Sequence, residues 1–271
     1  MPDVFEDFII ACDRSLIENK DSSISDKISD LVRDACYHPF NLAIMDGSLE
    51  VENFKYFIAQ DYYYLGDFAK SLKVISEKIY MNSDDFDLAL KNILDVMADD
   101  VQAFEIGMQS SYFQKYDIDL SSVKRSDCSA KYGQFLIDTA ERGEVSVSIA
   151  ALAPCYMFYE AVGCHFLEEF TKECFSSSLR ESFDIELYFD DWHYCHHDIM
   201  KFIYDNNPYA EWIETYTSPD FQKNVECMAY ALEYYLCRGD EKSSNDMFAS
   251  FEKSSCFEFE FWDDAYAYLA S

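Results

Sequence analysis

The sequence predicts an all-α protein, and three observations support this. Only 7 glycines and 5 prolines occur among 271 residues, too few for the many tight turns of a β protein. Apolar residues recur at helical spacing over long stretches. No segment has the Pro, Gly and Ser content of a linker, so we expect residues 1–271 to form a single domain.

The first long helix is expected to start near Gly47 and Ser48. Its apolar stripe comprises Phe54, Phe57, Ile58, Leu65, Phe68, Leu72 and Ile75. Asp61 falls inside this stripe and Tyr64 beside it, while Asp67 points away. Burying a carboxylate costs several kcal/mol unless it is paired. Asp61 is therefore predicted to have either a structural partner or a ligand.

A second apolar helix, over residues 149–163, contains Pro154 in its middle. A proline in a helix interior costs on the order of 3 kcal/mol, so we expect the helix to be broken there. The inward stripe comprises Ile149, Leu152, Cys155, Tyr156, Tyr159, Val162 and Phe166. Most buried cysteines are inert, but the break beside Cys155 also fits a nucleophile.

The last helix has a similar acidic residue on its apolar face. This face comprises Met247, Phe251, Trp262, Ala265, Tyr266 and Leu269. Glu258 lies on it, one turn before Trp262, whereas Glu260 points toward the side of Asp263 and Asp264. Glu258 is thus a candidate buried acid with a pKa raised toward neutrality. A structural acid hydrogen-bonded to a tyrosine is the alternative.

The net charge and the cysteine content indicate which partners and which cellular compartment to expect. The net charge of −31 would repel nucleic acid and anionic membranes, so we expect neither as a partner. The N-terminus lacks the basic start of a secretory signal, and we expect no apolar run to reach the roughly 20 residues that a membrane span requires. Ten cysteines without a CxxC pair indicate free, mostly buried thiols and a cytoplasmic protein.

The histidines offer one candidate metal site, in an excursion at about 176–205. His193 and His197 are four residues apart, with Asp190 three before His193, a spacing that can hold a metal. No second cluster supplies further ligands, so we predict no metal there. His38, followed by Pro39, is expected to fix a turn at a helix boundary.

Four segments, taken together and in this order, resemble the TenA/thiaminase II family. They are "HPFNLAIMDGSLEVENFKYFIAQDYYYLGDFAK" from His38, "IAALAPCYMFYEAVG" from Ile149, "YAEWIETYTSPDFQ" from Tyr209 and "FEFEFWDDAY" from Phe257. The resemblance covers most of the chain. It implies an all-α, haem-oxygenase-like fold and a symmetric homo-oligomer, expected to be a tetramer.

The resemblance also implies a set of site residues. Cys155 matches the family's catalytic cysteine and Glu258 its catalytic acid. The residues that would bind the aminopyrimidine are Asp61, Tyr64, Tyr132, Tyr159 and Tyr216. The implied reaction cleaves thiamin, or deaminates 4-amino-5-aminomethyl-2-methylpyrimidine, to give the hydroxymethylpyrimidine used in thiamin salvage. No metal or organic cofactor is implied.

Two other classes of function remain as alternatives. Ala161 stands where relatives often have an acidic residue, which would suit a non-catalytic pyrimidine-binding or regulatory protein. A helical di-metal oxidase would need inward Glu-x-x-His pairs. The chain has no such pair and only the Asp190-x-x-His193 spacing. We therefore favour the hydrolase.

Overall fold

The computed structural model describes residues 22–79, 85–174 and 192–270, and every regular element within these ranges is helical. The prediction of an all-α fold is confirmed. The α-helices are α2 (Ser22–Cys36), α3 (Pro39–Met45), α4 (Val51–Lys78), α5 (Asp85–Asp100), α6 (Ile106–Lys115), α7 (Asp127–Arg142), α8 (Val145–Cys174), α10 (Trp192–Asn206), α11 (Ala210–Tyr216), α12 (Pro219–Arg238) and α13 (Glu241–Ala267). A π-helical turn η2 (Val101–Glu105) joins α5 to α6, and a 3₁₀ turn η5 (Tyr268–Ala270) follows α13.

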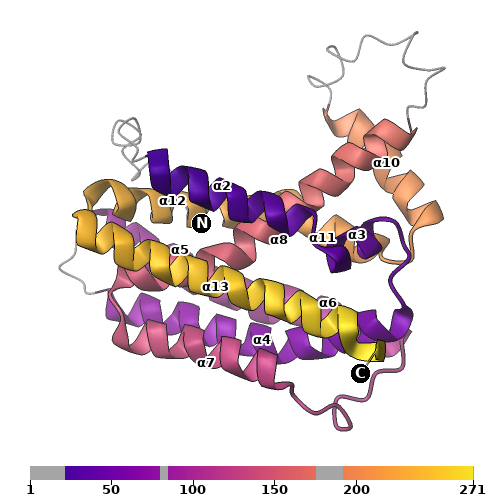
Figure 1. The fold of residues 1–271 in the computed structure, drawn as a ribbon, viewed down its shortest axis with the longest axis horizontal. Coiled ribbons are helices and arrows are strands. Elements are labelled where there is room, and N and C mark those ends of the chain that lie inside the picture. The colour runs from indigo at the N-terminus through magenta and orange to yellow at the C-terminus, as the bar shows by residue number, and fades with distance from the viewer. Residues whose placement is uncertain (1–21, 80–84, 175–191, 271) are drawn as a thin grey trace.

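The helices pack as a bundle around α8 (Figure 1). Helix α8 contacts α13, α12, α2 and α7, while α4 packs against α7 and α5. Figure 1 shows α13 crossing the molecule beside α4 and α7. One continuous hydrophobic core therefore joins the helices that carry the predicted site residues.

Helix α4 begins later than the sequence indicates. Its first residue is Val51 and its N-cap is Glu50, so the expected start at Gly47 and Ser48 is wrong. Gly47 has φ +73°, a left-handed conformation that suits a turn and that glycine adopts without strain. The predicted apolar stripe of α4 is buried along its whole length, with Asp61 inside it at 4% exposure.

Helix α8 runs continuously through Pro154, so the predicted break does not occur. Pro154 is buried within the helix, where α8 packs against α13 and α12. Tertiary packing supplies most of the stability of a helix in a protein. It offsets the loss of the hydrogen bond that proline cannot donate.

The apolar length of α8 also differs from our expectation. An 18-residue window within Val145–Thr171 has a mean hydropathy of 1.4, enough by length and composition to cross a membrane. We had expected no such run. Within the fold, 61% of that window is buried, as in a core helix, and the other ranges that the structure describes contain no further segment of this kind.

The two ends of the predicted face of α13 behave differently. Met247, Phe251, Trp262 and Ala265 are buried as expected. Tyr266 and Leu269 are 46% and 54% exposed, so their assignment to the buried face is wrong. The helix ends at Ala267, beyond the core.

The later half of the 176–205 excursion is helical. Helix α10 contacts α8 and α11, and its Ile199, Met200 and Ile203 are buried. Residues 176–191, and the side chains of His193 and His197, lie outside the described residues, as does Asp190. The prediction about metal binding there remains a prediction.

His38 fixes the start of α3 as expected. Its Nδ1 accepts a hydrogen bond from the backbone N–H of Phe40 at 3.3 Å, with Pro39 in the first turn. Its Nε2 lies 3.3 Å from Oδ1 of Asp263, which ties this turn to α13. The seven cysteines that the structure describes are all free, as expected, but only Cys36 and Cys227 are buried, so the prediction of mostly buried thiols is wrong for these seven.

Gly133 on α7 allows a close approach to α4. A Cβ there would lie 2.0 Å from Oδ2 of Asp67 and 2.6 Å from Nη2 of Arg125, two groups that form an ion pair at 2.5 Å. We expect Gly133→Ala to lower the free energy of unfolding by about 1–3 kcal/mol, because the ion pair must move. Urea denaturation measures this.

Gly66 on α4 is the matched control. It is exposed, and a Cβ would meet nothing within 4 Å. Gly66→Ala should raise the free energy of unfolding by about 0.5–1 kcal/mol, since alanine is the better helix former. A Gly133→Ala variant as stable as Gly66→Ala would contradict this view of the α4–α7 contact.

Candidate active site

The seven residues predicted from the sequence come together between five helices. They lie on α4 (Asp61, Tyr64), α7 (Tyr132), α8 (Cys155, Tyr159), α11 (Tyr216) and α13 (Glu258). Tyr159 is close enough to sense the charges of Glu258, Asp61, Tyr216 and Cys155. Six of the seven are buried, whereas Cys155 is half-buried.

Glu258 is the central acid of this group. It is 1% exposed, and its Oε1 lies 2.7 Å from the Tyr132 hydroxyl, which donates to it when the carboxylate is ionised. Burial raises the pKa of Glu258 to about 8, and the nearby charge of Asp61 adds to this, while the Tyr132 hydrogen bond acts the other way. A carboxyl group with this pKa is protonated at neutral pH and can act as a general acid.

Tyr132 is held from its other side by Ser254. The two hydroxyl oxygens lie 2.8 Å apart, and Ser254 donates to the Ala151 carbonyl on α8 at 2.6 Å. Ser254 is fully buried. Ser254 was not predicted as a site residue, although its position one turn before Glu258 places both residues on the same face of α13.

Cys155 faces the site from α8, one turn after Ala151. The Tyr64 hydroxyl lies beside its thiol and beside Tyr132 and Glu258, and burial first, then the charges of these three groups, raises the pKa of Tyr64 well above its usual range. That hydroxyl is buried but forms no hydrogen bond of normal geometry. Tyr64 is therefore a polar group available to a ligand next to the thiol.

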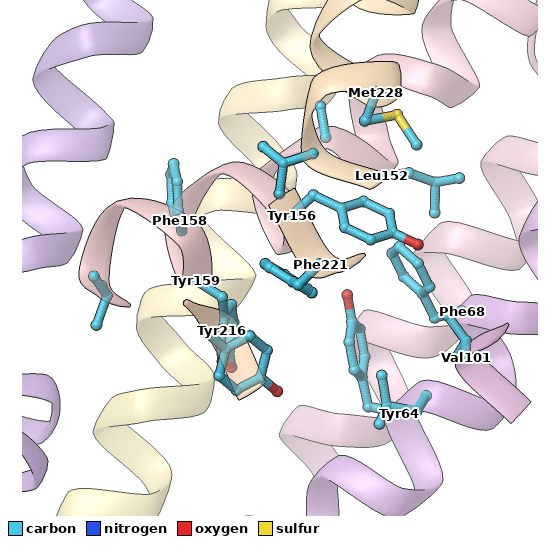
Figure 2. Packing of buried hydrophobic residues seen from close by; sticks show 14 of the residues in the cluster. Tyr64, Phe68, Val101, Leu152, Tyr156, Phe158, Tyr159, Tyr216, Phe221 and Met228 are labelled. Carbon is cyan, nitrogen blue, oxygen red and sulfur yellow. The ribbon is translucent and has the colours of Figure 1, made fainter. Parts of the chain in front are cut away.

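Aromatic rings surround the polar groups. The ring centroids of Tyr64 and Tyr132 are 4.6 Å apart, and those of Tyr159 and Tyr216 are 4.8 Å apart. Figure 2 shows Tyr64 facing Tyr159 and Tyr216 across the site, with Phe221 between them at one edge. Such faces suit a flat aromatic ligand.

The position of Tyr159 is set by a further residue that the sequence analysis did not assign to the site. Trp262 on α13 donates from Nε1 to the Tyr159 hydroxyl at 3.2 Å. Trp262 is fully buried and lies one turn after Glu258. The position of Trp262 on the apolar face of α13 was predicted. Only the folded structure shows that Tyr159 is its hydrogen-bond partner.

Tyr216 approaches α8 because of a glycine. A Cβ at Gly163 would lie 2.9 Å from Cγ2 of Thr217 and 3.1 Å from the carbonyl oxygen of Tyr216. The chain at the end of α11 therefore packs directly on the backbone of α8. Phe221, in the first turn of α12, then packs edge-on against the Tyr216 ring at 5.0 Å.

Glu260 separates from Glu258 as predicted, since it is exposed whereas Glu258 is buried. In the parts of the chain that the structure describes, no group of three His, Cys, Asp or Glu side chains is placed to hold a metal. The site thus presents a half-buried thiol, a neutral buried acid and a second buried carboxyl group, Asp61. This combination suits nucleophilic attack on a ring that the acid can protonate.

The chain is similar to several known proteins. An aminopyrimidine aminohydrolase from Halalkalibacterium halodurans is 25% identical over 84% of this chain and 87% of its own length. A TenA homologue from Pyrococcus furiosus has a TM-score of 0.68 at 18% identity, over 90% of this chain and 98% of its own. A Shewanella denitrificans domain with a haem-oxygenase-like fold has a TM-score of 0.64 at 12% identity, over 93% of this chain and 94% of its own.

The structural likenesses show that the chain has the haem-oxygenase-like fold. The family match runs through all five helices that carry the candidate site. Residues 25–268 match the TENA/THI-4/PQQC family, and the chain therefore belongs to that family.

Proposed function

We propose that this chain is a hydrolase of the thiaminase II type, which replaces the group on the methylene carbon of a 4-amino-2-methylpyrimidine with a hydroxyl group. The observation that carries the proposal is Glu258, a buried acid with a pKa of about 8 in the same site as the Cys155 thiol. The relative from H. halodurans is named for this class of reaction, which supports the assignment to thiamin salvage.

The first step activates the ring. Glu258 donates its proton to a ring nitrogen, which makes the ring carbons electrophilic. The thiolate of Cys155 then forms a bond to a ring carbon, and the displaced electron pair moves to the protonated nitrogen. Asp61 accepts a hydrogen bond from the exocyclic amine and so orients the ring.

The second step exchanges the substituent. In the covalent adduct, the C–N bond at the methylene breaks and its electron pair leaves with the thiazole, or with the amine as ammonia after the amine has taken up the proton released by the thiol. Water adds to the methylene carbon and gives up a proton, which restores the thiol when Cys155 is expelled, while the ring nitrogen returns its proton to Glu258 and the ring becomes aromatic again. Overall, one water molecule is consumed and a C–N bond becomes a C–O bond.

The aromatic residues support binding of the flat ring. The neighbouring rings of Tyr64 and Tyr132, and those of Tyr159 and Tyr216, present ring faces and hydroxyl groups. Stacking between such rings is typically worth about 0.5–1.5 kcal/mol for each pair beyond the area that it buries. The pocket residues would thus hold the pyrimidine while the two reactive groups act on it.

A product assay tests the proposal. The purified chain is incubated separately with thiamin and with 4-amino-5-aminomethyl-2-methylpyrimidine, and hydroxymethylpyrimidine is measured by chromatography. Formation of this product from either substrate, and its dependence on enzyme concentration, is the expected result. Tight binding of both compounds without product would instead favour the non-catalytic pyrimidine-binding protein.

A further inference from the structure

Three buried oxygen contacts around Glu258 require more protons than the two hydroxyl groups supply. The contacts join the Ala151 carbonyl to Ser254 at 2.6 Å, Ser254 to Tyr132 at 2.8 Å, and Tyr132 to Glu258 at 2.7 Å. Each distance lies in the normal range of an O–H···O hydrogen bond, so each contact needs its own proton between the two oxygen atoms. Each hydroxyl group carries only one proton.

The carbonyl at one end sets the direction of these bonds. A carbonyl oxygen only accepts, so the Ser254 proton is used on Ala151. The contact between Ser254 and Tyr132 then needs the Tyr132 proton, which leaves none for the contact with Glu258. A neutral Glu258 carboxyl group, donating to the Tyr132 oxygen, supplies the third proton.

Ionisation of Glu258 breaks this pattern. Tyr132 must then turn its proton toward the carboxylate, and the oxygen atoms of Tyr132 and Ser254 face each other without a proton between them. Ser254 is fully buried and Tyr132 is 1% exposed, so bulk water cannot replace the lost bond. An unmade hydrogen bond between buried groups is costly.

We propose that Ser254 is a positioning residue that keeps Glu258 protonated, because its bond to the Ala151 carbonyl directs the Tyr132 proton away from the carboxyl group. The Ser254–Tyr132 pair thus forms a relay of fixed direction. The relay couples the protonation of Glu258 on α13 to the backbone of α8, one turn before Cys155.

Other groups also face Glu258. They are Asp61 and Tyr64 on α4, Cys128 and Tyr132 on α7, and Cys155 and Tyr159 on α8. The charge of Asp61 also favours the neutral acid. The Tyr64 hydroxyl also faces Glu258 and acts to lower the pKa of Glu258, so it opposes the effect of Ser254 although it forms no hydrogen bond of normal geometry. The effect of Ser254 adds to burial and to the charge of Asp61.

The consequence for catalysis rests on the proposed function. The Ser254–Tyr132 pair keeps Glu258 protonated until the pyrimidine binds. When Glu258 gives its proton to the ring, Tyr132 can turn and donate to the new carboxylate. Loss of the Ser254–Tyr132 bond would therefore lower the pH at which Glu258 loses its proton. The alkaline limb of the pH–rate profile should shift to lower pH by the same amount.

The test measures the titration of Glu258 without any substrate. The chain is labelled with ¹³C at the glutamate carboxyl carbons, and the Glu258 signal is identified by its absence in Glu258→Gln. In Ser254→Ala, we expect the titration midpoint of this signal to fall by roughly one pH unit, since one hydrogen bond no longer opposes ionisation.

Ser255→Ala is the matched control. Ser255 is the next residue on α13 and is equally buried, but its hydroxyl donates to the Phe251 carbonyl within its own helix. Its midpoint should equal that of the unmodified chain. Ser254→Thr, which keeps the hydroxyl group, should restore a midpoint near the original value.

The result that would overturn the proposal is a Ser254→Ala midpoint that is unchanged or higher, in a chain whose spectrum shows the native fold. A fall of equal size in Ser255→Ala would also overturn it, because any loosening of α13 would then suffice. If Ser254→Thr does not fold, the comparison of the two alanine variants decides alone. None of these results depends on whether the chain turns over a pyrimidine, so failure of the proposed function would be recognised separately.

Discussion

Cys155→Ser is expected to lower the rate of hydroxymethylpyrimidine formation by at least about 10³-fold on both candidate substrates. Serine keeps the size of the side chain but is a far weaker nucleophile than a thiolate, so the covalent step should almost stop. The affinity for the pyrimidine should stay close to that of the unmodified chain, because in the proposed mode of binding Asp61 and the tyrosines hold the ring. Rates and calorimetric binding measure the two effects separately.

Cys164→Ser is the matched control for this change. Cys164 lies on the same helix, α8, and is half-buried like Cys155. It is not among the groups that face Glu258, so its variant should turn over substrate at a normal rate. Near-normal rates for Cys155→Ser on both substrates would show that the mechanism is not covalent and that Cys155 is a structural thiol.

Glu258→Gln is expected to lower turnover by about 10²–10⁴-fold, the usual range for loss of a general acid. The amide keeps the shape of the carboxyl group and its bond to Tyr132, but it has no acidic proton for the ring. The alkaline limb of the pH–rate profile, which a group with a pKa of about 8 produces in the unmodified chain, should disappear. Steady-state rates measured from roughly pH 6 to 9, on both sides of the pKa of this acid, measure both effects.

Glu260→Gln controls for a change of charge on the same helix. Glu260 is exposed and points away from the site, so its variant should keep both the rate and the pH profile. Equal losses in the two glutamine variants would indicate a general effect of net charge rather than a role for the buried acid.

The main features of the site follow from helical periodicity. Asp61 and Glu258 interrupt apolar stripes with a period of 3.6 residues, and such stripes become buried whichever helices they meet. Their burial was therefore predictable before the partners were known. The exposed position of Glu260, two residues from Glu258, follows from the same geometry.

Contacts between helices account for what the sequence analysis missed. Ser254 is a small polar residue on α13, and only the approach of α7 and α8 gives it Tyr132 and Ala151 as partners. Gly163 likewise gains its role when the end of α11 packs on α8. Periodicity places a residue on a face but does not say which backbone or side chain will lie opposite.

The wrong boundaries have local causes. A glycine and a serine are a common start signal, yet Gly47 adopts a left-handed turn and α4 begins four residues later. At the C-terminal end of α13, the apolar stripe continues in sequence to Leu269, but its side chains are no longer buried in the core after Ala265. Pro154 remains within α8 because the surrounding helices stabilise that segment.

The double variant Cys155→Ser/Glu258→Gln tests most directly whether the two residues act together on one step. Hydroxymethylpyrimidine formation is measured for the unmodified chain, the two single variants and the double variant under the same conditions. If the thiolate adds only to a ring that Glu258 has protonated, the double variant should be little slower than the slower single variant, because residues that act as a unit are not additive. A double variant slowed by the product of the two single effects would contradict this account, since the two residues would then act independently.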